Sequence, residues 1–288
     1  MRYRLRRFLF LILGLAAAAG AFAQGGALRA GAVVKDLQGT LTIQTGTSPQ
    51  QAHKPGTAIP VGAIVRTGAD SSAMLVFPDG QVCALGGNSA VRVARYAYVP
   101  TESSKSEMSL NLLRGGLRCV AGEIARSNPA GSRLQVGVVT LRVDPDAQRA
   151  DALVVAQDGS VAATVERGGV TVFLPSGQPQ PITAGQGLIL APDGTLVRDT
   201  AAKIVQQLDS LPQGQEMRKQ FAALESVGQD MAVTVIMLST PEVADKLLVQ
   251  LENLPPPEQV APQPELGAAT TPPTGAGGGG LPCGASCN

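Results

Sequence analysis

Residues 55–93 read PGTAIPVGAIVRTGADSSAMLVFPDGQVCALGGNSAVRV. Within Ser72–Phe77, apolar and small or polar residues alternate with a period near two, which is the period of a strand. Pro78-Asp79-Gly80 follows, and an Asp-Gly pair accepts the positive φ that a two-residue hairpin turn requires. This stretch therefore predicts a strand, a turn and a second strand.

The same pattern continues from Gly31 to about Leu196, where short Val, Ile, Leu and Thr runs are separated by Gly-containing turns. Further turns are expected at Asp158-Gly159, at Pro175-Ser176-Gly177 and at Pro192-Asp193-Gly194. Many short strands at close intervals predict a mainly β domain, built as a β-sandwich or a twisted β-solenoid.

A helical pattern replaces the strand pattern after Thr200, with apolar residues three or four apart at Ile204, Leu208, Leu211, Met217, Phe221 and Leu224. This spacing predicts amphipathic helices, the first of them ending at Pro212. Met231–Leu238 is uninterrupted apolar sequence, compatible with either a buried helix or a buried strand. Thr240 and Pro241 resemble the N-cap and first position of a last helix, which Pro255-Pro256-Pro257 ends.

The two ends of the chain carry different signals. Basic residues in 2–7, the apolar run Phe8–Gly20 and Ala21-Phe22-Ala23 match a secretory signal peptide over 1–23, with a mature chain beginning at Gln24. The alternative, an uncleaved anchor, is disfavoured because the 16 residues of 8–23 fall short of the roughly 20 that span a membrane. Residues 255–288 are rich in Pro and Gly and are expected to be a disordered tail.

These boundaries give four parts: the signal peptide 1–23, an all-β domain 24–198, a helical region 199–254 and the tail 255–288. A periplasmic or secreted bacterial protein is expected, with no membrane span after cleavage.

Charge and aromatic content exclude several classes of protein. Lys+Arg number 23 and Asp+Glu 22, and loss of the four arginines of the signal peptide changes the net charge from +1 to 1 − 4 = −3. Such a chain does not attract nucleic acid through its net charge. Aromatic residues make up 3% of the chain, too few for a platform that stacks bases or sugars.

The order of short motifs in 55–93 resembles the FecR domain family. The residues that occupy the family pattern are Gly62, Ile64, Thr67, Gly68, Asp70, Ser71, Ala73, Phe77, Asp79, Gly80, Asn88 and Ser89. Further matches lie at 113–118, at 165–172 and at Ala184-Gly185-Gln186, so the resemblance extends from Gly31 to about Asp193. Gly137–Val143 departs from the family's Gly-Val-Arg-Gly-Thr strand. Gly62, Thr67, Gly68, Asp79, Gly80, Asn88 and Gly185 are interpreted as turn residues of the pattern.

The resemblance implies an exported, stand-alone, non-enzymatic binding or regulatory module of the bacterial cell envelope. Signalling members of the family place an anti-sigma segment before a membrane span, whereas seven residues precede the apolar run here. The partner is expected to be another envelope protein or an envelope polymer. The alternatives are a structural scaffold or secreted adhesion-like protein, and an enzyme that cleaves glycans with carboxylates alone.

No catalytic, cofactor-binding or metal-binding set emerges from the sequence. His53 is the only histidine and has no cysteine nearby, so a solvated loop residue is expected. Asp144, Asp146 and Asp151 lack the Gly and the closing Glu of a calcium loop and are interpreted as a polar turn.

The four cysteines, Cys83, Cys119, Cys283 and Cys287, allow three disulfide pairings in an exported chain. Pairing of Cys83 with Cys119 and of Cys283 with Cys287 is the simplest arrangement, because the first two lie in expected strands and the last two in the tail. The family pattern implies that the strands of Cys83 and Cys119 are neighbours in one β unit. The alternative is that these two are buried free thiols.

Overall fold

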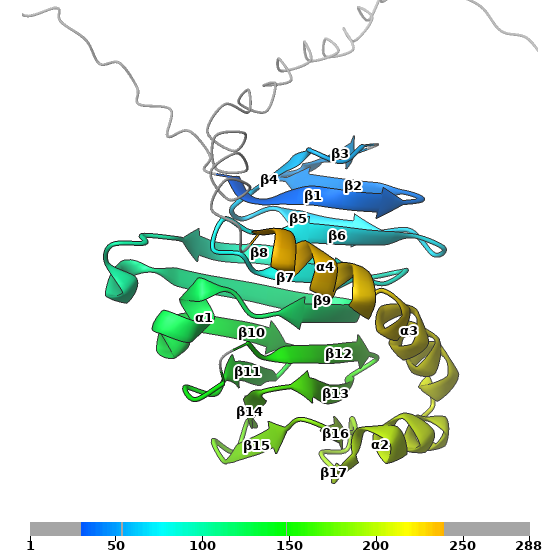
Figure 1. The fold of residues 1–288 in the computed structure, drawn as a ribbon. Helices are drawn as coiled ribbons and strands as arrows, with labels where there is room; N and C mark the ends of the chain where they lie inside the picture. The colour runs from blue at the N-terminus through cyan, green and yellow to red at the C-terminus, as the bar shows by residue number, and fades with distance from the viewer. Residues whose placement is uncertain (1–29, 53, 148, 239–288) are drawn as a thin grey trace, which may run out of the picture. The chain divides into compact units, whose positions relative to one another are not determined.

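The computed structural model describes residues 30–52, 54–147 and 149–238. Strands occupy most of the chain up to Thr200 and helices follow, which confirms the predicted mainly β fold with a small helical region (Figure 1). The expected signal peptide, last helix and tail lie outside the described residues, as do His53, Cys283 and Cys287.

The strands form two hydrogen-bonded ladders joined into one open sheet. The first ladder has, in spatial order, β4 (Ala58–Pro60), β1 (Ala30–Gln38), β6 (Ser72–Val76), β7 (Val82–Leu85), part of β9 (Glu107–Val120), β12 (Asp151–Gln157), β13 (Ser160–Arg167), β16 (Gln186–Leu190) and β17 (Leu196–Thr200). The second ladder has β3 (Ser48–Ala52), β2 (Leu41–Thr45), β5 (Ile64–Thr67), β8 (Ala90–Ala97), the rest of β9, β10 (Ser132–Val136), β11 (Val139–Val143), β14 (Gly169–Phe173) and β15 (Pro179–Thr183).

Strand β9 belongs to both ladders. Its residues up to Arg114 pair with β8 in the second ladder, and its residues from Gly115 pair with β12 in the first. The change occurs at Gly115, whose φ is +81°. A Cβ there would lie 2.5 Å from the Cα of Ser89, so this crossing point requires glycine.

One apolar core lies between the two ladders and a second lies under the helices. In β6, Ala73 and Leu75 face the first core, whereas Met74 and Val76 face the second. The first ladder is therefore buried on both faces, which explains why its strands are almost continuously apolar.

The second core is closed by α2 (Ala201–Gln207), α3 (Gly214–Ser226) and α4 (Gly228–Leu238), which run alongside the strands in Figure 1. Met231–Leu238 is thus helical, and the sequence left it undecided because a buried helix and a buried strand share an apolar run. Short elements complete the chain: α1 (Glu123–Ser127) and the 3₁₀ turns η1 (Ser103–Lys105), η2 (Pro129–Gly131) and η3 (Leu208–Ser210).

No single helix among the described residues has the length and apolar character of a membrane span. Taken together, α3 and α4 meet that criterion by length and composition, with a 43° bend between them.

The expected turns are present, but only one is a two-residue hairpin. Asp158 and Gly159 both have positive φ, 45° and 84°, and join β12 directly to β13. At Pro78-Asp79-Gly80 only the glycine has positive φ, and the Gly80 N–H donates to the carbonyl of Phe77 while the Phe77 N–H donates to that of Gln81. This is a three-residue hairpin, because proline cannot adopt the positive φ that the first position of a type I′ turn needs. The turns at 175–177 and 192–194 have the same pattern.

Candidate functional site

Several residues of the family pattern meet where the loop after β7 crosses β5 and β9. The buried Thr67 hydroxyl donates to the carbonyl of Gly86 at 2.6 Å and accepts from the Ser89 N–H at 3.0 Å. Ser89 Oγ in turn accepts from the N–H of Gly116 at 2.9 Å. The neighbouring Asn88 has a positive φ of 51°, which asparagine tolerates better than most residues. These hydrogen bonds satisfy buried backbone groups, so this corner, formed by Thr67, Asn88 and Ser89, stabilises the fold.

Gly62, Gly80 and Gly185 lie apart from this corner, each in a turn of its own. Gly62 and Gly185 have φ of 89° and 77°, and Gly80 lies in the hairpin between β6 and β7. Gly68 instead permits a close approach, because a Cβ there would lie 2.4 Å from Thr40 Oγ1.

Asp79 forms a buried polar centre at the hairpin after β6. Its Oδ1 accepts from the Gln81 N–H at 3.3 Å and from the Tyr96 hydroxyl at 3.3 Å, and its Oδ2 accepts from the Ile124 N–H at the start of α1 at 3.2 Å. Burial raises the pKa of Asp79 from 3.8 to about 6 despite these donors. Burial also raises the pKa of Tyr96, with the Asp79 charge as a second cause.

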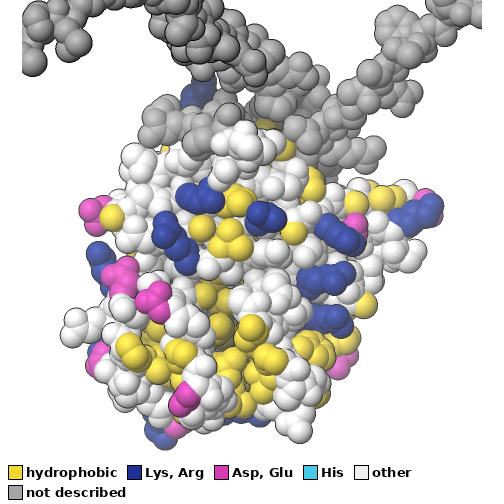
Figure 2. Space-filling view, turned by 180° about the vertical axis from the view of Figure 1, so that it is seen from behind, with side chains coloured by type: hydrophobic (Ala, Val, Ile, Leu, Met, Phe, Trp, Pro, Cys, Tyr) yellow, Lys and Arg dark blue, Asp and Glu magenta, His cyan; other side chains and the backbone are white. Residues whose placement is uncertain are grey.

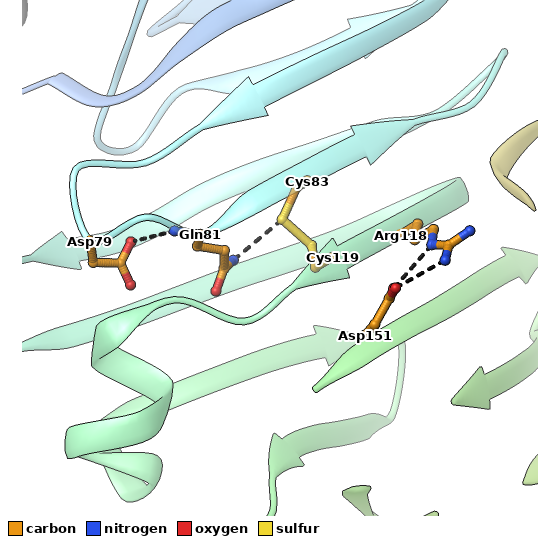
Figure 3. Close-up of a disulfide and its surroundings, with 6 residues drawn as sticks. All are labelled: Asp79, Gln81, Cys83, Arg118, Cys119 and Asp151. Atoms are coloured by element: carbon orange, nitrogen blue, oxygen red, sulfur yellow. Dashed lines mark hydrogen bonds and ion pairs between the residues drawn. A yellow bond between two sulfur atoms is a disulfide. The ribbon is translucent and has the colours of Figure 1, made fainter. Parts of the chain in front are cut away.

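Cys83 and Cys119 form a disulfide beside this centre (Figure 3). The two residues are directly opposed in the ladder of β7 and β9, with Cα atoms 4.2 Å apart. The side-chain amide of Gln81 donates to Cys83 Sγ at 3.3 Å. The predicted pairing of these two cysteines is confirmed.

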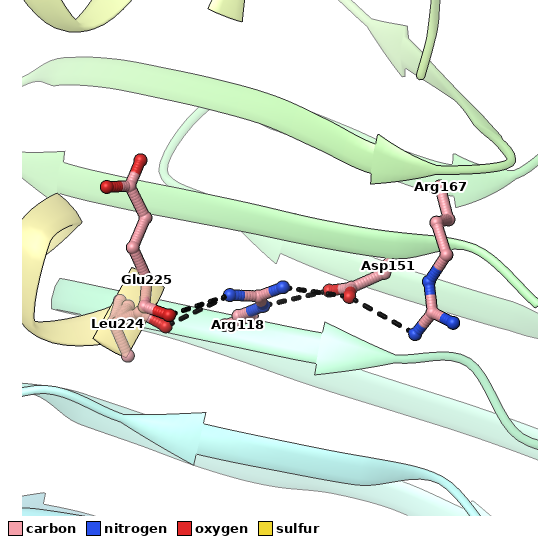
Figure 4. A network of polar contacts seen from close by, with 5 residues as sticks. All are labelled: Arg118, Asp151, Arg167, Leu224 and Glu225. Carbon is pink, nitrogen blue, oxygen red and sulfur yellow. Dashed lines mark hydrogen bonds and ion pairs between the residues drawn. The ribbon is translucent and has the colours of Figure 1, made fainter. Parts of the chain in front are cut away.

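A second polar centre fixes the helices to the sheet (Figure 4). Arg118 of β9 binds Asp151 of β12 through two hydrogen bonds, Nε to Oδ1 at 3.0 Å and Nη2 to Oδ2 at 2.9 Å. Arg118 Nη1 donates to the carbonyls of Leu224 and Glu225 at 3.2 and 3.4 Å, at the end of α3. The side chains of Arg118 and Asp151 are 9% and 3% exposed, so the pair is shielded from water. Arg167, which is exposed, approaches Asp151 at 3.5 Å.

Sequence reasoning missed this second centre. In the sequence, Arg118 is the last residue of the family match at 113–118 and precedes Cys119 in an expected strand, and Asp151 is interpreted as part of a polar turn with Asp144 and Asp146. That interpretation is wrong for Asp151, which lies in β12 and is paired with Arg118. A charged residue inside the apolar run Leu117–Ala121 was the available signal, because a buried charge needs a partner.

A small cavity of about 60 Å³ lies between the ladders next to Cys119. Its lining includes Met108, Leu110, Leu134 and Leu141. Small-molecule sites have volumes of roughly 300–1,000 Å³, so this cavity is too small for a metabolite. Among the described residues, no group of three or more His, Cys, Asp or Glu side chains is placed to hold a metal ion.

Asp79 gives a test of this geometry through pH. The pKa of Asp79 is higher in the folded state than in the unfolded state, so folding favours the protonated carboxyl. The wild-type protein therefore has its full stability below about pH 4 and loses part of it as the pH rises through about 6, where the buried carboxyl must ionise. Asp79→Asn cannot ionise, so its free energy of unfolding relative to wild type should rise by about 2 kcal/mol between pH 4 and pH 7, as measured by urea unfolding.

Asp193→Asn is the matched control, since Asp193 lies in a second Pro-Asp-Gly turn of the same type but is exposed. The Thr195 N–H lowers the pKa of Asp193, so its variant should change little with pH and in the opposite direction. A stability difference for Asp79→Asn that is the same at both pH values would contradict the buried, protonated carboxyl.

Residues 63–171 match the protein-family model described as FecR protein. The match runs from the start of β5 into β14 and includes both polar centres and the disulfide. This match confirms the predicted resemblance to the FecR domain family over this part of the chain.

No curated protein matches the chain. Two crystal structures of a candidate anti-sigma factor from Parabacteroides distasonis ATCC 8503, at 1.65 and 2.50 Å resolution, are similar to it. Both are 17% identical, with TM-scores of 0.38 and 0.39, and the alignments cover 48% and 50% of this chain. They cover 59% and 63% of those chains, so this protein spans about three fifths of their length.

Proposed function

We propose that this protein is an exported regulatory module of the bacterial envelope, which acts by binding another protein and not by catalysis. The FecR match over residues 63–171 carries the proposal, since this family is regulatory. The polar residues of the matched region support it: Thr67, Asp79 and Arg118 are buried, and each is hydrogen-bonded to backbone groups or to a side-chain partner. These bonds stabilise the sheet, so we assign the binding of a partner to exposed side chains.

Export is supported by two independent features. The order of basic residues, apolar run and Ala21-Phe22-Ala23 matches a cleaved signal. The disulfide between Cys83 and Cys119 is of a kind that persists in oxidising compartments.

The test is a chromosomal deletion in the producing bacterium, followed by transcript profiling. A regulator should change the expression of a limited set of genes, and full-length protein supplied in trans should restore it. The matched control is the same protein lacking residues 2–23, which is not exported and should not restore expression.

An unchanged transcript profile with a weakened envelope would instead favour the structural scaffold. Restoration by the protein that lacks residues 2–23 would contradict an envelope location.

A further inference from the structure

The outer face of the second ladder carries six arginines, here named the arginine face: Arg66, Arg92, Arg95, Arg114, Arg133 and Arg142. Arg66 and Arg92 alternate with Val65, Val91 and Val93, which are buried in the core between the ladders, so these two arginines point outward. Bulges in the ladder of β8 and β9 place Arg95 opposite Ser109 and Arg114 opposite Ala90, on the same outer face. Arg133 and Arg142 alternate with the buried Val136 and Leu141 of their own strands. No helix of the second core covers this side. Figure 2, viewed from behind Figure 1, shows Lys and Arg side chains spread over the upper and middle part of that surface.

The strand register aligns four of these arginines in two pairs across the strands. Arg66 and Arg114 both lie opposite Ala90, from β5 and β9, and Arg95 and Arg133 both lie opposite Ser109. Residues two strands apart are separated by about 10 Å. The outer face therefore presents two pairs of cations, each pair at this spacing.

The charged residues of these strands are almost all arginines. Strands β5, β8, β9, β10 and β11 contain seven arginines, no lysine and a single acidic residue, Glu107. The seventh arginine, Arg118, faces the helices. Protein interfaces are enriched in arginine and depleted in lysine and in acidic residues, whereas attraction to a charged membrane is supplied by either cation.

Among the described residues, much of this charge has no counterion. In the described part of the chain, Arg92, Arg114 and Arg133 make no ion pair, and the exposed pair of Arg95 with Glu107 is 3.6 Å long. Arg66 donates to Gln44 Oε1 at 2.6 Å, and Arg142 lies over the Phe173 ring at 5.0 Å. These neutral partners orient the guanidinium groups without neutralising them.

We propose that the arginine face is the docking surface for an acidic face of a partner protein. The inference rests on the proposed function and adds the location and chemistry of its binding site. Guanidinium groups bind carboxylates through two parallel hydrogen bonds, so a partner with surface Asp and Glu side chains fits this array.

The experiment uses full-length protein in the producing bacterium, with a photo-crosslinking amino acid placed at Asn111 or Gln135 within the arginine face. The same amino acid at Lys219 on α3 is the control position. Crosslinking from Asn111 or Gln135 to one protein, identified by mass spectrometry and then purified, is the expected result.

Charge reversal then tests the chemistry. Arg92→Glu/Arg114→Glu/Arg133→Glu should weaken binding of the purified partner at least tenfold, and changing the crosslinked partner's acidic residues to Lys should restore it. Lys35→Glu/Lys203→Glu/Lys219→Glu, with the same change in net charge on β1, α2 and α3, should leave affinity within about twofold. Both triple variants should keep the wild-type thermal midpoint, because they change exposed side chains.

The other outcomes separate the two proposals. A protein crosslinked only from Lys219 overturns the arginine face and leaves the proposed function intact. Absence of any protein crosslink from Asn111, Gln135 and Lys219 overturns both the arginine face and the proposed function. Crosslinks to lipid or glycan, with binding of the purified protein to phosphatidylglycerol vesicles that the arginine variants lose, would overturn the choice of a protein partner.

Discussion

Replacing Arg118 by methionine should lower the free energy of unfolding by about 3–5 kcal/mol, the usual cost of leaving one member of a buried ion pair without its partner. The side chain of Asp151 is 3% exposed and would keep only Arg167, 3.5 Å away and 57% exposed. The carbonyls of Leu224 and Glu225 would also lose their donor. Urea unfolding of the purified protein at pH 7 measures the change.

Two companion variants identify the cause. Arg167→Met removes the exposed partner of Asp151 and should cost less than about 1 kcal/mol, as exposed ion pairs do. Arg118→Met/Asp151→Leu removes both buried charges and should recover most of the loss, since a buried pair and an apolar pair of similar volume are often close in stability. A loss below about 1 kcal/mol for Arg118→Met alone would show that Asp151 has access to water.

Arg118→Met should lower the local stability of the helices more than that of the strands. Arg118 is the polar link between β9 and the end of α3, whereas the strands keep their ladders. Hydrogen exchange of the α3 amides should therefore accelerate in Arg118→Met more than that of β12. Equal acceleration in both elements would show that helices and sheet unfold as one unit.

Local chemistry made much of the fold predictable from the sequence. Asp158-Gly159 forms the expected hairpin because both residues tolerate positive φ. Ser72–Val76 forms the expected strand, with Ala73 and Leu75 facing one core and Met74 and Val76 the other. Met231–Leu238 could not be assigned, since its environment under the first ladder is a property of the whole fold.

Long-range features were beyond the sequence for a related reason. The crossing of β9 between ladders depends on the approach of Ser89 to Gly115, and the pairing of Arg118 with Asp151 joins residues 33 positions apart. The arginine face is likewise scattered along β5, β8, β9, β10 and β11, and becomes a surface only once these strands are side by side.

Replacing Cys83 and Cys119 together by alanine should lower the free energy of unfolding by about 2–4 kcal/mol under oxidising conditions. The bridge joins residues 36 positions apart, and the closed loop contains β8, η1 and β9 as far as Arg118. Constraining this segment lowers the entropy of the unfolded chain, and the directly opposed positions in the ladder let the bond form without displacing either strand.

A reducing agent gives the control for this variant, because reduced wild type and the double alanine variant both lack the bridge. Their unfolding free energies should differ by less than about 1 kcal/mol, the loss of two small buried side chains. If the gap between the proteins persisted unchanged in reducing buffer, the stabilisation would come from packing of the sulfur atoms and not from the covalent link.

The thiol state also connects stability with location. Protein recovered from the envelope should show no free thiol at Cys83 or Cys119 in non-reducing peptide mapping, whereas protein lacking residues 2–23 and retained in the cytosol should show both free. The retained form would then be less stable by the same 2–4 kcal/mol or so, a large share of a typical net stability of about 5–15 kcal/mol. The folded protein would consequently be more stable in the envelope, where its proposed partner is found. Free thiols at Cys83 and Cys119 in the envelope fraction would contradict this link between export and stability.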